Sequence, residues 1–211
     1  MTHFNEIFVD VDAYQPPSKW EERFNNLQVW LIVALLLVGG WFFKDWMMDQ
    51  FRFLALAEGQ PAIPYPVQWQ QQPTEAVTLQ VVDPASESPF PARETVAVQN
   101  APKSDFTMTW PEQRALQLSD YKEVERRLVK LADERQALWL LYTYVSDVGT
   151  TPAASVAPVV VVQAQDVVFE ITNDQGQKQW VVITLAADSH EWNQEWPTFR
   201  RILEKLGVPV L

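Results

Sequence analysis

The densest group of residues that could do chemistry lies just before the last predicted helix. It comprises Asp188, His190, Glu191 and Glu195. Carboxylates beside an imidazole can exchange protons with a substrate or coordinate a metal ion. No second histidine at ligand spacing and no matching base accompany this group in the sequence. We therefore interpret it as a solvated loop rimmed by Trp192 and Trp196, and we predict that the chain has no catalytic residue.

The sequence also lacks the motifs that hold cofactors. It has no G-x-S-x-G elbow, Walker loop, G-x-G-x-x-G turn or EF-hand loop, and its six glycines are few for a phosphate cradle. Without cysteine it cannot attach c-type haem or ligate an iron–sulfur cluster. The two histidines, His3 and His190, are far apart, so a zinc or b-type haem site made by this chain is not expected. We predict no cofactor, no metal and no enzymatic activity of its own, although the chain can belong to an oxidoreductase complex.

Charge limits the possible partners. The formal net charge is -11 and the sequence pI is about 4.6. Nucleic-acid phosphates require a basic surface, and so does a polybasic clamp on a membrane. We therefore exclude nucleic acid as a partner.

The segment with the most functional information is the apolar run at residues 29–43, VWLIVALLLVGGWFF, which contains no charge. A hydrocarbon core of roughly 30 Å requires about 20 helical residues, which residues 27–48 supply. Indole rings favour the membrane interface. We therefore predict one transmembrane helix, anchored by Trp30, Trp41 and Trp46.

A cleaved signal peptide is the alternative for this segment. A signal peptide begins with a short basic region and ends at small residues, whereas here a long, net-acidic stretch comes first and bulky aromatics follow. A retained helix is therefore favoured. The flanking cations are balanced, two on each side, so the positive-inside rule gives little direction. We favour a single-pass protein of the inner or plasma membrane, with a cytoplasmic N-terminus and an extracytoplasmic C-terminal domain.

Four regions are expected along the chain. Residues 1–26 form a polar arm, and residues 27–48 form the transmembrane helix. Ser18 and Glu21 have capping-box spacing, so an early start of this helix at residues 20–26 is the alternative. Residues 49–74 are predicted to continue as an interfacial helix and then as an extended Pro/Gln-rich linker, semi-rigid from residue 59 to residue 73. Residues 75–211 form an α+β domain.

Within the α+β domain we expect a mainly antiparallel sheet with helices on one face. Alternating β-rich segments predict strands, and a turn rich in Asn, Asp and Gly predicts a hairpin. The predicted strands are 76–82, 93–100, 105–110, 159–172 and 178–186. The helical period across 111–147 predicts two helices, the second beginning near Asp120 and carrying an apolar stripe. The tetravaline run at 159–162 is interpreted as a buried strand, with an exposed edge as the alternative. A final helix is predicted to begin at Pro197 and end at Gly207.

Six tryptophans lie beyond the predicted span, where they are either core residues or interface anchors. They are Trp69, Trp110, Trp139, Trp180, Trp192 and Trp196.

The whole plan resembles the single-span accessory subunit of alternative complex III, the quinol-oxidising complex of filamentous anoxygenic phototrophic bacteria. The resemblance is one of layout and composition: one span, a region rich in Gln, Pro and Trp, and a small domain without cysteine. It implies electron transport through haem and iron–sulfur subunits that this chain only braces. The function expected first is thus a non-catalytic accessory subunit of a membrane protein complex, in contact with the lipid bilayer and other subunits.

Two alternatives stay open. One is a single-span assembly component of a bacterial secretion or conjugation machine. The other is a membrane-tethered hydrolase or ligand-binding protein, for which the sequence offers no recognisable constellation of residues.

Overall fold

The structure is a computed structural model, and it describes residues 18–48, 50–56, 62–101, 105–147 and 159–209. The chain divides into two compact units, residues 1–47 and residues 48–211. The expected N-terminal arm lies mostly outside the described residues.

The first unit contains one long helix, α1 (Lys19–Met48). It has the early start that was the alternative to a start at residue 27, because the Ser18–Glu21 capping box forms: the Ser18 N–H donates to Glu21 Oε2 at 2.7 Å, and the Glu21 N–H donates to Ser18 Oγ at 3.3 Å. Its apolar window has a mean hydropathy of 1.9, and none of that window is buried. By length and composition, α1 is the one helix among the described residues that could cross a membrane.

The prediction of an interfacial helix and a free linker after α1 is wrong where the structure describes those residues. Strand β1 (Phe51–Leu54) pairs antiparallel with β2 (Ile63–Pro66), and β3 (Gln70–Gln71) pairs with β4 (Leu79–Val82). Two prolines fit in β2 because it has a single partner strand, so one of its edges needs no ladder donors. Ile63 at the start of β2 is completely buried, so this segment belongs to the core.

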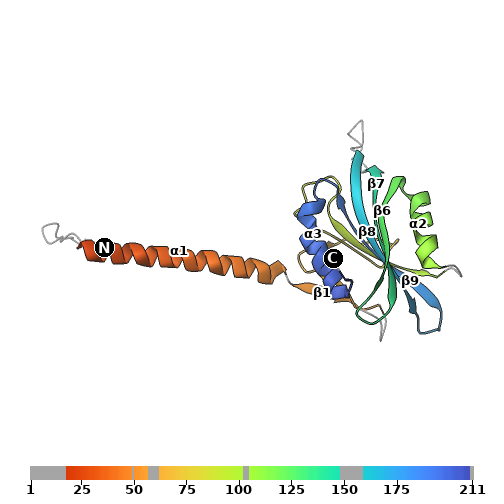
Figure 1. The fold of residues 1–211 in the computed structure, drawn as a ribbon, viewed down its shortest axis with the longest axis horizontal. Coiled ribbons are helices and arrows are strands. Elements are labelled where there is room, and N and C mark those ends of the chain that lie inside the picture. The colour runs from red at the N-terminus through yellow and green to blue at the C-terminus, as the bar shows by residue number, and fades with distance from the viewer. Residues whose placement is uncertain (1–17, 49, 57–61, 102–104, 148–158, 210–211) are drawn as a thin grey trace, which may run out of the picture. The chain divides into compact units, whose positions relative to one another are not determined.

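The second unit is built on a seven-stranded sheet, drawn in Figure 1. Its strand order is β3-β4-β5-β9-β8-β7-β6, and every pairing is antiparallel. The five longer strands are β5 (Arg93–Asn100), β6 (Ser119–Lys130), β7 (Gln136–Asp147), β8 (Val159–Thr172) and β9 (Lys178–Asp188). The α+β class and the mainly antiparallel sheet are confirmed.

The central strands behave largely as predicted. The tetravaline run opens β8, which lies between β7 and β9 in the sheet. In the strand register of the described residues, all four valines pair with β7, whereas the pairing with β9 begins only at Val162, so the interpretation of the run as a buried strand holds in part. Val160 and Val162 are buried, whereas Val159 and Val161 are exposed at this end of the strand. The predicted hairpin is present, since Asn173 and Gly176 form the turn between β8 and β9.

The two helices predicted within residues 111–147 are wrong beyond residue 117. Most of this region is the β6–β7 hairpin, and Asp120, the predicted helix cap, adopts a positive φ of 51° within β6. The predicted strand 105–110 is also wrong, because Asp105 caps helix α2 (Phe106–Gln117) by accepting a 2.9 Å hydrogen bond from the Thr107 N–H.

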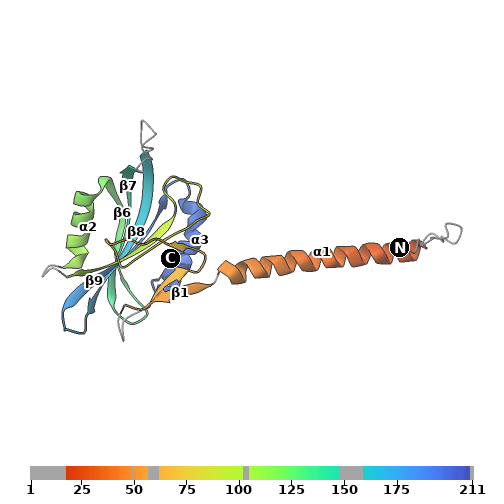
Figure 2. The same ribbon diagram turned by 180° about the vertical axis from the view of Figure 1, so that it is seen from behind.

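The helices of the domain cover both faces of the sheet, and not the single face that was expected. Figures 1 and 2, seen from opposite sides, place α2 on one side and α3 (Trp192–Leu206) on the other. Trp110 of α2 packs with Leu138, Leu140 and Val168 in one apolar cluster. Alternate residues of the same strands pack beneath α3 in a second cluster.

Helix α3 begins five residues before Pro197 and ends as predicted. Its inner face carries four apolar residues at helical spacing, which are all buried: Phe199, Ile202, Leu203 and Leu206. Gly207 terminates the helix in the left-handed conformation, with φ of 81°.

Candidate functional site

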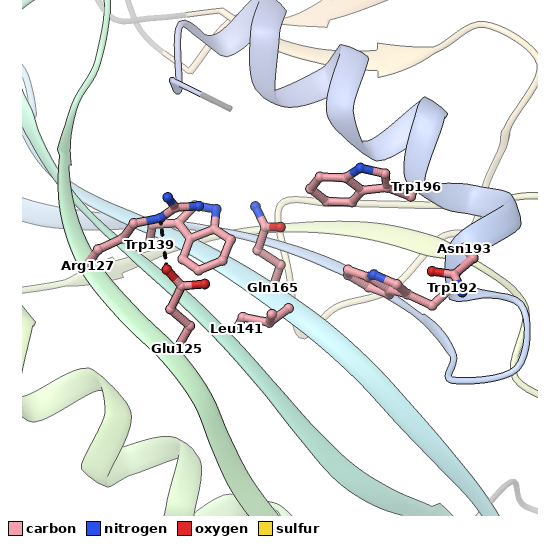
Figure 3. A pocket seen from close by; sticks show the side chains of 8 residues that line it. All are labelled: Glu125, Arg127, Trp139, Leu141, Gln165, Trp192, Asn193 and Trp196. Carbon is pink, nitrogen blue, oxygen red and sulfur yellow. Dashed lines mark ion pairs between the residues drawn. The ribbon is translucent and has the colours of Figure 1, made fainter. Parts of the chain in front are cut away.

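A pocket of about 270 Å³ lies between the sheet and the first turns of α3 (Figure 3). Strands β6, β7 and β8 form its base, and α3 forms its opposite wall. Its lining consists of Glu125, Arg127, Trp139, Leu141, Gln165, Trp192, Asn193 and Trp196.

Strand register places the polar groups at the base of the pocket in one row across the sheet. Glu125 pairs with Leu141, Leu141 with Gln165, Gln165 with Leu185, and Leu185 with Glu94. Residues directly opposite each other on neighbouring strands point to the same face. Three polar side chains therefore alternate with two leucines beneath α3, and neighbouring polar positions are roughly 10 Å apart at the Cα atoms, two strand spacings.

Gln165 is the least expected member of this row. It is 0% exposed, and within the described part of the chain neither its Oε1 nor its Nε2 has a hydrogen-bond partner. Leaving such a group unpaired costs about 1–3 kcal/mol. Figure 3 shows its side chain rising between Trp139 and Trp196, so the free amide faces the pocket. A polar ligand in the pocket would supply the missing hydrogen bonds.

Aromatic rings form much of the pocket wall. Trp192 and Trp196, one helical turn apart on α3, stack with ring centroids 6.1 Å apart and an interplanar angle of 28°. Trp139 lies on β7, and the guanidinium carbon of Arg127 sits 4.0 Å from its ring centroid. The pocket thus offers flat apolar surfaces around a buried amide.

The charges at the pocket mouth compensate each other. Arg127 Nε lies 3.7 Å from Glu125 Oε1, beyond hydrogen-bond distance but within an ion pair. About half of the Glu125 side chain is exposed, so this pair contributes little to stability. Both groups are available to a ligand at the rim.

Glu94, at the other end of the row, is also buried without a partner. It is 0% exposed, and neither carboxylate oxygen has a hydrogen-bond partner among the described residues. Burial raises the pKa of Glu94 well above its ordinary value. Glu94 therefore keeps its proton to a higher pH than a solvated glutamate does.

A separate polar network fixes α2 on the opposite face. Asp166, next to Gln165 but pointing the other way, accepts hydrogen bonds from Trp110 Nε1 (2.7 Å), Arg114 Nε (2.7 Å), Tyr142 Oη (3.1 Å) and Thr184 Oγ1 (2.7 Å). Burial, together with the Asp166 charge, holds the pKa of Tyr142 well above its ordinary value, so this hydroxyl keeps its donor proton. Every partner is satisfied, so we interpret this network as structural.

The acidic residues Asp188 and Glu191, noted in the sequence as possible chemistry, hold a neighbouring loop in place. Asp188 accepts a 2.7 Å hydrogen bond from Ser88 Oγ, and Glu191 accepts one of 2.5 Å from Ser86 Oγ. These bonds attach the loop after β4 to the start of α3. Among the residues that the structure describes, no group of three or more His, Cys, Asp or Glu side chains could hold a metal ion.

Glu195, on the first turns of α3, is expected to make the stability of the domain depend on pH. Burial, with the nearby charges of Asp83 and Glu191, raises the pKa of Glu195 to about 7. The folded protein therefore binds more protons than the unfolded chain between about pH 4.5 and 7. We expect the free energy of unfolding to fall by about 1 kcal/mol across that window, after allowance for solvent screening of a partly exposed group. Urea titrations at several pH values measure this slope.

The variant Glu195→Gln is expected to flatten this slope and to be the more stable protein at pH 8. Glu204→Gln, on the exposed side of the same helix, is the matched control and should leave the slope in place. An unchanged slope in Glu195→Gln would contradict the assignment.

The predicted tryptophans fall into three groups. Trp30, Trp41 and Trp46 are exposed on α1, where membrane anchoring stays a prediction. Trp69, Trp110, Trp139 and Trp180 are buried in the core. Trp192 and Trp196, expected to rim a loop, lie on α3 and line the pocket. Gln165 was not predicted from the sequence, because β8 also carries Gln163, Asp166 and Glu170 and nothing distinguishes Gln165 from these other polar residues.

No known family profile matches the chain, and no curated protein is significantly similar to it in sequence. Among solved structures, the domain is similar to LpqN of Mycobacterium tuberculosis, described as involved in cell envelope biogenesis, with 14% identity and a TM-score of 0.51. That match covers 79% of this chain and 96% of LpqN. The Ran-binding protein Mog1p of Saccharomyces cerevisiae has 11% identity and a TM-score of 0.44, with 74% of this chain and 92% of Mog1p covered. The LpqN likeness shows a shared fold.

Proposed function

We propose that this chain is a membrane-tethered, non-catalytic accessory protein of the cell envelope, and that its α+β domain binds a ligand in the tryptophan-lined pocket. The observation that carries the tether is the apolar surface of α1. Leu35, Leu36 and Leu37 are successive residues, so they point to different sides of the helix, and they are 63%, 71% and 71% exposed. Exposing such a surface to water on every side of the helix is unfavourable. Its transfer from water into lipid is favourable by roughly 25 cal/mol per Å² of apolar surface.

The pocket supports a binding role for the domain. Gln165 lines the pocket with a buried amide that has no hydrogen-bond partner among the described residues. Such an amide costs the fold stability, but it can form hydrogen bonds with a bound ligand. LpqN, which shares the fold, is described as involved in cell envelope biogenesis, and the envelope is the setting that we propose for this chain. As to its partner, we propose an integral membrane complex, with alternative complex III as the first candidate.

Membrane fractionation tests the tether. The full chain is expected in the membrane fraction and should resist alkaline carbonate extraction. A variant with both Leu35→Arg and Leu36→Arg should move to the soluble fraction, because two arginines at the centre of a span each cost about 2.5–3.5 kcal/mol. Leu116→Arg is the control, since Leu116 is 89% exposed on α2. Recovery of the unaltered chain in the soluble fraction would refute the tether.

The absence of cysteine makes the side of the membrane easy to test. In Leu116→Cys the new thiol is unique and exposed. We propose an extracytoplasmic domain, so a membrane-impermeant maleimide should label this thiol in intact cells, as it does after lysis. Labelling only after lysis would place the domain in the cytoplasm.

Copurification in mild detergent then tests the partner, because an accessory subunit should elute with redox subunits in fixed ratio.

A further inference from the structure

We infer that the tryptophan-lined pocket receives one neutral sugar ring, so that the ligand class of the domain is a saccharide. This inference rests on the binding role proposed above and names its chemistry. It is carried by the flat aromatic walls, the unpartnered amide of Gln165, the balanced charge at the rim and the size of the pocket.

The aromatic walls match the apolar face of a sugar. A pyranose presents several C–H groups on one face, and these lie favourably on the electron-rich face of an indole ring. Trp192 and Trp196 stack at 28° to each other and provide such a surface along one wall. Trp139 stands across the pocket from them, with Gln165 between (Figure 3). A ring held between these walls would point its edge toward the amide.

The Gln165 amide matches the edge of the sugar. Its Nε2 supplies two donors and its Oε1 accepts, and neither atom has a hydrogen-bond partner among the described residues. A sugar hydroxyl both donates and accepts, so two neighbouring hydroxyls can satisfy both ends of the amide. A purely apolar ligand would leave the amide unpaired, so it fits this pocket less well.

The rim charges argue for a neutral ligand. Glu125 and Arg127 carry opposite charges 3.7 Å apart, so a cation or an anion would meet attraction from one and repulsion from the other. The Trp139 ring already has the Arg127 guanidinium beside it, so it is a poor cage for a second cation. Hydroxyl groups can use the carboxylate as an acceptor and the guanidinium as a donor.

The volume limits the ligand to about one ring. Pockets for drug-sized ligands span roughly 300–1,000 Å³, and the value of about 270 Å³ lies just below that range. A single sugar unit fits, either free or as the end of a longer glycan.

The test is a tryptophan-fluorescence titration of the full chain in a detergent without sugar headgroups, because maltosides or glucosides would compete. Methyl glucoside, methyl galactoside and methyl mannoside are the soluble probes, and cosedimentation with insoluble cellulose or chitin tests a glycan end. Saturable binding of at least one probe is expected. Binding of a soluble methyl glycoside would identify the ligand as a free sugar. Cosedimentation with cellulose or chitin, without binding of any soluble glycoside, would identify it as the end of a glycan polymer.

The decisive variant is Gln165→Leu. It should weaken binding at least tenfold while leaving the thermal midpoint unchanged or higher, because it removes a buried unpaired amide. Gln163→Leu, two residues earlier on the same face of β8 and outside the pocket lining, should alter neither property. Failure of every probe to bind, or full binding by Gln165→Leu, would overturn the saccharide assignment. Neither result would affect carbonate resistance, which tests the tether separately.

Discussion

Replacing Asp166 with alanine is expected to lower the free energy of unfolding by about 3–5 kcal/mol, the usual effect of removing one partner from a buried ion pair. Asp166 is completely buried, and the Arg114 side chain that it holds is only 16% exposed. The substitution would leave Arg114, Trp110 Nε1 and the Tyr142 hydroxyl without their shared acceptor. Helix α2 would then lose its polar attachments to β8 and keep the hydrogen bond from Arg114 Nη2 to Thr184 Oγ1 of β9, at 2.8 Å. Urea unfolding followed by tryptophan fluorescence measures the loss.

The control is the double variant Asp166→Leu with Arg114→Met. Removing both charges avoids the stranded guanidinium, so this variant should recover the part of the stability that Asp166→Ala loses through the unpaired charge, while Trp110 Nε1 and the Tyr142 hydroxyl stay without their acceptor. If the double variant were as unstable as the single one, the loss would come from packing or from the unpaired neutral donors and not from the unpaired charge.

Gly207→Ala is expected to destabilise the domain by about 2–5 kcal/mol. The residue has φ of 81°, a conformation that costs an L-residue about 1–2 kcal/mol. An added Cβ would also lie 2.5 Å from Ala132 Cβ and 2.7 Å from the Ala132 backbone nitrogen, and such overpacking costs a further 1–3 kcal/mol or so. Thermal unfolding should show a clearly lower midpoint.

Gly176→Ala separates the two causes. Gly176 has a similar φ of 75°, but nothing lies within 4 Å of the position that an added Cβ would take. It should therefore show only the conformational cost. Equal losses at Gly176 and Gly207 would show that the contact between the helix end and Ala132 has no effect.

The apolar span and the C-terminal elements could be predicted because their patterns are local. Helix α1 follows from a continuous apolar run with a capping box, and the β8–β9 hairpin follows from alternation around an Asn/Gly turn. The stripe of α3 follows from its helical period. Each of these signals is contained within one stretch of sequence.

The β6–β7 hairpin could not be predicted in this way because tertiary pairing overrides its local preference. Strand β6 is rich in Glu, Lys and Arg, which favour helices, and Lys130 and Glu134 have the i,i+4 spacing of a helical pair. As an edge strand, β6 is exposed on both faces and shows little alternation. The aromatic and β-branched residues of β7 were the better signal, since Trp139 and Tyr142 point to opposite faces and both are buried.

The pocket depends on register, which the sequence does not reveal. Glu125 and Gln165 line one pocket, with Glu94 further along the same row, only because their strands pair in one particular alignment. A shift of one residue in any pairing would turn the row to the other face. Trp192 and Trp196 were recognisable as a pair, but nothing in the sequence indicated what lies opposite them.

The strand order has a kinetic consequence. Strands β6, β7 and β8 pair as hairpin neighbours, whereas β5 pairs with β9, as in the partners Arg93 and Ala186. Pairings this distant in sequence close slowly, and a chain made from its N-terminus has no β9 until every other strand of the sheet has been made. Strands β3 to β5 therefore cannot pair with the rest of the sheet until the β8–β9 hairpin has formed. A chain truncated before β9 would contain two separate sheet fragments and no continuous core.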